Sequence, residues 1–350
     1  MVKNRTKKLF VVDTMAMAFR NYHAFGARPL LTSFGQPTSA IYGSLSFIVG
    51  LIEREKPDYL IFATDTKEPT FRHKMFPTYK ANRDEMPEEL AAQIEPLYEL
   101  INLLGAPLLK MPGFEADDLI GSLVTQYDDK DIHHYIVSGD KDFMQLVSDR
   151  VSLYAPKKAQ EALIITAKEV LEKFGCEPNH VIEALAIIGD ASDNVPGAHG
   201  IGEKGAANLV AEYKTLENIY QNLAKITNQR QNSALVASKE AVFMARQLVT
   251  IKKDVPLSLK LDDIAFSIDN LGRKELKEFC TKMDFRSLVS RLDKYKTISA
   301  TPTIKAGGML FDEEPENTEA RQARPRTPGY KVIQQENEFQ TLLSEWHKVD

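Results

Sequence analysis

Three acidic side chains stand close together in the stretch GFEADDLIG, which begins at Gly113. The glycine breaks the preceding structure and an apolar run follows the acids, so Glu115, Asp117 and Asp118 are expected at the first turn of a helix. One acid there would be an ordinary helix cap that suits the positive end of the helix dipole. Three acids within four residues repel one another and indicate a bound cation. A plain acidic cap is the alternative if the stretch is considered alone.

Further acids follow short apolar runs that are typical of β-strands. LFVVD ends in Asp13, YLIFATD ends in Asp65, and HHYIVSGDKD contains Asp140 and Asp142. Helical segments separate these runs, which predicts a parallel sheet covered by helices. The carboxyl ends of parallel strands line one edge of such a sheet. We therefore expect these acids to meet the Glu115 cluster there; the alternative is that they are unrelated acids in ordinary turns.

A second acidic pair precedes a glycine-rich turn in ALAIIGDASDNVPGAHGIGEKGAANLV. Asp190 and Asp193 are three residues apart, so they can face the same way within one helical turn. The turn satisfies Gly-x-Gly-x-x-Gly, but no strand precedes it, which argues against a dinucleotide site. We expect a helix, a tight hairpin and a second helix, in which Gly200, Gly202 and Lys204 offer N–H groups and charge to phosphates. A plain turn between helices is the alternative.

Cations alternate with aromatic rings in the segment TFRHKMFPTYKANR, which follows Asp65. This mixture suits single-stranded nucleic acid, because cations meet phosphates and rings stack on bases. A solvated loop is the alternative. Arg20, on the helix expected after the first strand, is a second candidate phosphate contact, since a guanidinium matches a phosphate well. The predicted contacts in the segment itself are Arg72, Tyr79, Lys80 and Arg83.

Composition indicates a globular protein. The chain has 350 residues, 43% of them hydrophobic and 27% charged, which is enough for two or more cored domains. Its two cysteines, Cys176 and Cys280, offer neither a disulfide framework nor a metal-thiolate spacing, so we expect a reducing, cytoplasmic location. No membrane span or signal peptide is predicted. The net charge of −5 does not exclude nucleic acid, because acids and bases can gather in separate sites.

The composition changes near the end of the chain. Residues 296–328 are rich in Thr, Pro, Gly, Glu and Arg and predict a linker. Within it, Met309, Leu310 and Phe311 form an apolar knot that is a candidate docking peptide for a sliding clamp, with chance occurrence as the alternative. Residues 329–350 predict the start of a further domain that the chain does not finish.

In order and spacing, LFVVD, FRHKMFPTYKANR, GFEADDLIG, SGDKDFMQLV and GDASDNVPG followed by GIGEKGAANL resemble the 5′ nuclease domain of bacterial DNA polymerase I, within the flap endonuclease family. The resemblance is specific because five separated motifs agree. It implies a PIN-like α/β nuclease domain over residues 1–178, with a basic and aromatic arch near residues 66–93. It also implies an all-α helix-hairpin-helix domain over residues 179–295, and a 3′–5′ exonuclease-like domain beginning at residue 329.

The resemblance implies a Mg²⁺- or Mn²⁺-dependent nuclease that acts on DNA with 5′ flaps, nicks or RNA primers. Its metal ligands are expected to be Asp13, Asp65, Glu115, Asp117, Asp118, Asp140, Asp142, Asp190 and Asp193. Its DNA contacts are expected to be Arg20, Arg72, Tyr79, Lys80, Arg83, Gly200, Gly202 and Lys204. In this family the hairpin can also hold K⁺ through backbone carbonyls. Thr14 and Met15, and Ala198, His199 and Gly205 in the hairpin, depart from the usual residues, but no carboxylate is lost.

An all-oxygen ligand set suits Mg²⁺ or Mn²⁺, and two such ions about 3.5–4 Å apart can activate water and stabilise the leaving oxygen. We expect Asp13, Asp65, Glu115 and Asp117 to serve one ion, and Asp140, Asp142 and Asp193 to serve the other. Lys80 and Arg83 would stabilise charge on the scissile phosphate, which makes them catalytic with Asp140.

Two other functions are open. A catalytically silent scaffold that holds branched DNA should have lost acids, and this chain keeps them. A phosphatase with an Asp nucleophile would want a second Asp two residues after Asp13, where Met15 stands instead.

Overall fold

The apolar runs that precede the acids form the centre of a single sheet. The computed structural model describes residues 5–26, 28–128, 131–157 and 161–298. The strands are β1 (Lys7–Asp13), β2 (Tyr59–Ala63), β3 (Leu108–Leu109), β4 (Ile132–Val137), β5 (Val151–Pro156) and β6 (Ala162–Ile165). Their order is β3-β2-β1-β4-β5-β6, with β1 to β5 parallel and β6 antiparallel to β5. The predicted parallel sheet is confirmed, and β6 is an addition that the sequence pattern did not reveal.

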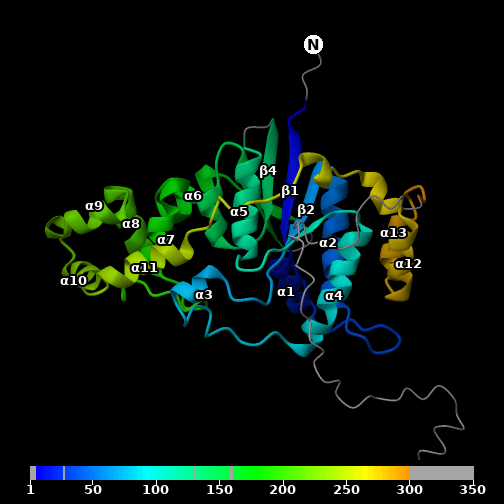
Figure 1. The fold of residues 1–350 in the computed structure, drawn as a ribbon, viewed down its shortest axis with the longest axis horizontal. Coiled ribbons are helices and arrows are strands. Elements are labelled where there is room, and N and C mark those ends of the chain that lie inside the picture. The colour runs from blue at the N-terminus through cyan, green and yellow to red at the C-terminus, as the bar shows by residue number, and fades with distance from the viewer. Residues whose placement is uncertain (1–4, 27, 129–130, 158–160, 299–350) are drawn as a thin grey trace, which may run out of the picture. The chain divides into compact units, whose positions relative to one another are not determined.

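Alternation along β1 sends its side chains into two hydrophobic cores, one on each face of the sheet. Helices lie on both sides of the sheet (Figure 1). Leu9 and Val11 join one core, and Phe10 and Val12 join the other. The first core is covered by α5 (Ala116–Gln126), α6 (Ala167–Phe174), α7 (Val181–Ile188), α8 (Glu203–Tyr213), α9 (Leu216–Gln221), α10 (Gln229–Ala237) and α11 (Lys239–Val249). The second is covered by α1 (Thr14–Ala24), α2 (Ser39–Glu55), α4 (Glu88–Leu103), α12 (Lys274–Lys282) and α13 (Arg286–Leu292).

The last two helices correct the predicted extent of the helical domain. That domain was expected to run to residue 295, but Leu276 of α12 and Leu288 of α13 lie in the core on the opposite face of the sheet from α7 and α8. Their apolar stripes pack with α2 and α4 rather than with the hairpin helices, because after α11 the chain passes the amino end of β2, where the Phe266 N–H donates to the Asp58 carbonyl. Only the tertiary contacts reveal this crossing.

Shorter elements connect these layers. They are α3 (Phe71–Met75) and the 3-10 helices η1 (Lys141–Leu146), η3 (Pro178–His180), η4 (Leu223–Lys225), η5 (Leu261–Ile264) and η6 (Ile268–Gly272). Within the part of the chain that the structure describes, no helix has both the length and the apolar character needed to cross a membrane.

The order of the strands indicates where a ligand crevice is expected. The chain runs from β1 outward to β2 and β3 on one side, and returns to β4 and β5 on the other side of β1. In open α/β sheets, ligands bind beyond the carboxyl ends of the strands where the order reverses. Asp13 is the last residue of β1, at this position.

Candidate active site

The carboxyl ends of the strands bring the first group of acids together. Asp13 caps α1, since its Oδ1 accepts a hydrogen bond from the Ala16 backbone N–H at 3.0 Å. Its Oδ2 accepts from the Ser138 hydroxyl, which follows β4, at 3.1 Å. Asp65 follows β2 and accepts from the Ala116 N–H at 2.8 Å, which ties the start of α5 to the end of that strand. The predicted convergence of these segments is therefore present in the fold.

The pKa values of these carboxyl groups are raised by burial and by the charges of their neighbours. Burial, together with the charges of Asp65 and Asp140, raises the pKa of Asp13 to about 6. Burial, followed by the charges of Asp13 and Asp140, raises the pKa of Asp117 well above its usual value. A bound cation relieves this mutual repulsion, because the positive charge of the cation favours the ionised form of each carboxyl group.

A second group lies around η1 and the turn after α7. Burial and the charge of Asp140 raise the pKa of Asp142 to about 7. The Oδ1 atom of Asp142 is buried and has no hydrogen-bond partner among the described residues. Lys141 approaches Asp190 at 3.3 Å. Burial alone would raise the pKa of Asp190, but hydrogen bonds from Ser192 and the charge of Lys141 outweigh it, and the pKa is lowered.

These donors fit hard divalent cations. Carboxylate oxygens are the ligands that Mg²⁺ and Mn²⁺ prefer. The buried Oδ1 of Asp142, which has no hydrogen-bond partner among the described residues, is free to bind such an ion. In the described ranges, no three His, Cys, Asp or Glu side chains already stand in one ligand shell. The carboxylates of each group would therefore have to move closer together to hold an ion, with water completing its coordination.

Glu115 is held by three donors from the basic and aromatic segment. Its Oε1 accepts from Lys80 Nζ at 2.6 Å. Its Oε2 accepts from Tyr79 Oη at 3.1 Å and from Arg72 Nη1 at 3.2 Å. Arg72 and Tyr79 are only 2% and 6% exposed. Both were expected to contact DNA, and the structure turns them inward because the buried carboxylates need partners.

Asp118 differs from the other acids and does not fit the expected role of metal ligand. It is fully buried, and both its oxygens accept hydrogen bonds from the Arg72 guanidinium, at 2.7 and 2.8 Å. They also accept from the backbone N–H groups of Glu115 and Lys252, at 3.1 and 2.9 Å. Its lone pairs are thus taken by protein donors.

Two basic side chains join the arch segment to the turn after α7. Arg83 Nη2 lies 2.7 Å from an oxygen of Asp193, and Lys80 Nζ lies 4.0 Å from the other. The Lys80 backbone N–H donates to the Asp193 carbonyl at 2.8 Å, and the Asn194 amide donates to the Thr78 carbonyl at 2.7 Å. Lys80 and Arg83 therefore stand at the rim of the acid cluster, between Glu115 and Asp193.

The glycine hairpin forms as predicted between α7 and α8. Gly189 ends α7, and Gly202 is the residue before α8. Gly200 has φ +89°, a left-handed conformation that favours glycine. A Cβ added at Gly200 or Gly202 would meet no atom within 4 Å, and Lys204 is exposed. This side of the hairpin is open.

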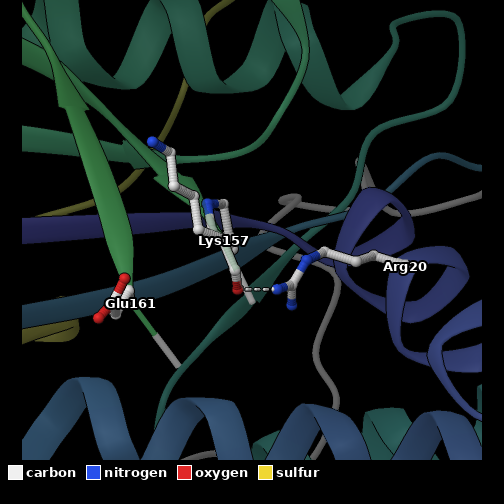
Figure 2. Close-up of a pocket in the computed structure, with 4 residues that line it drawn as sticks. Arg20, Lys157 and Glu161 are labelled. Atoms are coloured by element: carbon white, nitrogen blue, oxygen red, sulfur yellow. Dashed lines mark hydrogen bonds between the residues drawn. The ribbon is translucent and has the colours of Figure 1, made fainter. Parts of the chain in front are cut away.

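Arg20 lies apart from these contacts. Its guanidinium points away from α1 toward the end of β5 and donates to the Lys157 carbonyl at 2.5 Å (Figure 2). It lines a pocket of about 490 Å³ together with Pro156, Lys157 and Glu161. This hydrogen bond is exposed to solvent, and a phosphate contact by Arg20 would require it to open.

The sequence reading missed Ser138. Its hydroxyl, 2% exposed, donates to Asp13 and accepts from the Asp140 N–H at 3.2 Å. It thereby links the ends of β1 and β4 inside the acid cluster. The only available signal was its place in SGDKD, directly between the strand and the acids.

Comparison with known proteins agrees with this geometry. Residues 8–175 match the family described as 5′-3′ exonuclease, N-terminal resolvase-like domain, and residues 176–271 match the family described as 5′-3′ exonuclease, C-terminal SAM fold. A 5′-3′ exonuclease of Aquifex aeolicus is 35% identical over 288 residues, which cover 82% of this chain and 96% of that protein.

The chain belongs to the 5′-3′ exonuclease family.

Other relatives of this family are longer. A DNA polymerase I of Caldicellulosiruptor bescii is 38% identical over 291 residues, covering 81% of this chain and 33% of that protein. The chain thus spans about a third of the polymerase relatives that it matches.

Solved structures share the fold. The T5 5′-exonuclease with bound divalent zinc ions aligns with a TM-score of 0.57 and 25% identity, covering 80% of this chain and 99% of that chain. The catalytic core of Rad2 in complex with DNA aligns with a TM-score of 0.55 and 17% identity, covering 82% and 93%. These structures confirm the predicted α/β fold with a helical second part.

Proposed function

We propose that this protein is a metal-dependent structure-specific nuclease that hydrolyses phosphodiester bonds near 5′ ends and 5′ flaps of DNA and RNA primers. The observation that carries the proposal is the gathering of Asp13, Asp117 and Asp142 at the carboxyl edge of the sheet, where burial and neighbouring acids raise their pKa values. Such a cluster is costly unless cations neutralise it, and cations held there can in turn bind an anionic phosphodiester.

The residues present fit two divalent ions, Mg²⁺ or Mn²⁺. Asp13, Asp65, Glu115 and Asp117 would hold one, and Asp140, Asp142 and Asp193, with Asp190 beside them, would hold the other. When bound, such ions lower the pKa of water and stabilise the charge on the attacking and leaving oxygens. The T5 5′-exonuclease with bound zinc ions supports a metal-dependent reaction in this family.

The chain's own side chains orient the reacting groups. Ser138 fixes the rotamer of Asp13 and the backbone before Asp140, so the two strand ends keep one spacing. Lys80 and Arg83 stand between Glu115 and Asp193 at the rim of the cluster. From there they can exchange a carboxylate for the scissile phosphate, and stabilise its developing charge.

The open hairpin would bind the duplex. Backbone N–H groups around Gly200 and Gly202, with Lys204 at the first turn of α8, suit phosphate without reading bases. A K⁺ held by hairpin carbonyls would add positive charge at the same place. Rad2 in complex with DNA has this fold, which supports DNA as the ligand.

The polymerase relatives support a wider context in which this chain is the N-terminal part of a DNA polymerase I. The alternative is a separate exonuclease like that of Aquifex aeolicus, whose length the chain nearly covers. The proposed clamp-docking residues Met309, Leu310 and Phe311 lie outside the described residues.

A 5′-labelled flap duplex tests the proposal. We expect short labelled products with Mg²⁺ and none in excess chelator. Intact DNA that is nevertheless bound in Mg²⁺ would support the silent scaffold instead. Release of phosphate without strand scission would indicate a phosphatase.

A further inference from the structure

Arg72 uses every donor of its guanidinium inside the protein. Besides its contacts with Glu115 and Asp118, Nε donates to the Leu248 carbonyl at 2.7 Å and Nη2 donates to the Thr250 carbonyl at 2.9 Å. These carbonyls lie at the carboxyl end of α11, where a cation is favoured by the helix dipole. A guanidinium keeps its charge at physiological pH, and here it faces the carboxylates of Asp118 and Glu115. Arg72 therefore stays charged and has no donor left for a phosphate.

Asp118, the acid that faces Arg72, also accepts hydrogen bonds from backbone N–H groups. Asp118 sits in the first turn of α5 and accepts from the N–H of Glu115, the residue that caps this helix. The carboxylate of Asp118 thus fixes the main chain of Glu115, while Arg72 contacts its side chain. The buried pair of Arg72 and Asp118 therefore fixes both the backbone and the side chain of Glu115.

The same pair anchors an extended stretch, residues 250–259, which we call the crossing segment because it passes over α5. Its backbone is held by side chains rather than by a neighbouring strand. Lys252 N–H donates to Asp118 at 2.9 Å and Val255 N–H donates to Ser122 at 3.0 Å. At its far end, Tyr127 donates to the Leu259 carbonyl at 2.8 Å.

The crossing segment lies very close to α5. A Cβ added at Gly121 would come within 2.6 Å of Ile251 and 2.8 Å of the Lys252 carbonyl, so only glycine fits there. Gln145, which follows the active-site acids on η1, donates to the Val249 carbonyl at the end of α11 at 2.9 Å and accepts from the Ile251 N–H of the crossing segment at 3.0 Å. The segment is therefore fixed to two elements that carry candidate metal ligands.

We infer that Arg72 and Asp118 form a buried positioning pair, which fixes the Glu115 carboxylate against α5 and the crossing segment, and that neither residue binds DNA or metal directly. This inference rests on the proposed nuclease function and specifies how one ligand of its site is oriented. Partners that orient metal ligands in this way typically change metal affinity or activity by roughly 10–100-fold when replaced.

The test uses Arg72→Lys, which keeps the charge but cannot make the forked contact with Asp118. Mn²⁺ affinity is measured without DNA by electron paramagnetic resonance, and flap-duplex affinity is measured in Ca²⁺. We expect Mn²⁺ binding to weaken about tenfold or more, kcat to fall by a similar factor, and the Kd for DNA to stay within about twofold. Asp118→Asn should give the same pattern, because it also breaks the pair.

Lys74→Ala is the matched control, since Lys74 is an exposed cation on the same helix, α3. It should leave Mn²⁺ affinity unchanged. Circular dichroism shows whether each variant is folded, and addition of guanidinium to Arg72→Ala should restore part of the Mn²⁺ affinity.

A large rise in the Kd for DNA with unchanged Mn²⁺ affinity would overturn the inference and make Arg72 a substrate contact. Unchanged values of both would overturn it as well. If the wild-type chain cuts no DNA, the nuclease proposal fails by itself, while the Mn²⁺ titration still reports on the pair.

Discussion

The arch segment around α3 and the glycine hairpin between α7 and α8 are both stretches that the sequence assigns to DNA binding, yet the fold uses them differently. Arg72 and Tyr79 in the first are buried and bound to carboxylates. Gly202 and Lys204 in the second are exposed, with open space above the backbone. Arg72 is drawn inward because the buried carboxylates need a partner, whereas the start of a helix leaves backbone N–H groups available to phosphates.

The two regions are therefore expected to have separate roles. The arch segment and the acid cluster should govern cleavage and ion binding, and the hairpin should govern duplex affinity. Each of the following changes affects one region and should leave the other intact.

The largest effect is expected from Asp140→Ala. Loss of this carboxylate should lower kcat by about 10²–10³-fold or more, because the charge that it places in the site acts mainly in the transition state. Binding of flap DNA should be nearly intact. Gel-shift and single-turnover cleavage assays measure the two separately, and normal turnover would refute the assignment of Asp140.

Next in size is the effect of Mg²⁺ on folding. The folded pKa values of Asp13 and Asp142, about 6 and about 7, lie above the ordinary value of 3.8. The folded state therefore holds more protons than the unfolded chain between about pH 4 and 7, and these acids make the ion-free fold less stable as the pH rises through that window.

Saturating Mg²⁺ should consequently raise the Tm by several degrees at pH 8, and by less at pH 5.5, where protons compete for the same oxygens. An ion at a hundredfold excess over its Kd contributes about 2.7 kcal/mol. Differential scanning calorimetry measures the shift. Asp142→Asn should reduce it and Gly202→Ala should not; an equal shift at both pH values would contradict this account.

A smaller effect is expected from Gly202→Ala. The added Cβ meets no protein atom, so the Tm should be unchanged, but it projects into the open side of the hairpin where a phosphate would approach. Loss of one hydrogen bond to a charged group should weaken duplex binding about tenfold. Fluorescence anisotropy measures the Kd. A fall in kcat at saturating DNA, with no change in Kd, would break the division between the two regions.

The smallest effect is expected from Lys204→Ala, which should reduce the slope of log K against log salt by about 1, since one phosphate contact is lost. Arg72→Lys should leave the slope unchanged because Arg72 is buried. Titrations of DNA binding at salt concentrations from about 50 to about 200 mM compare the two variants. Equal slopes for wild type and Lys204→Ala would exclude Lys204 as a phosphate contact.

Local sequence was sufficient for much of the fold. Apolar runs ending in acids predicted β1, β2 and β4. Strand ends in a parallel sheet share an edge, so the gathering of Asp13, Asp65 and Asp140 followed as well. Placement of α12 and α13 did not, because an apolar helical stripe does not reveal which face of the sheet it will cover.

By itself, the sequence determined which residues carry charge and where strands, helices and tight turns begin, because these depend on neighbours a few positions apart. Tertiary structure alone decided which charges face each other. Arg72 and Asp118 are 46 positions apart, and Asp118 meets Lys252 after a further 134. Burial of these two side chains required each to find a partner, which turned Asp118 from an expected metal ligand into the partner of Arg72.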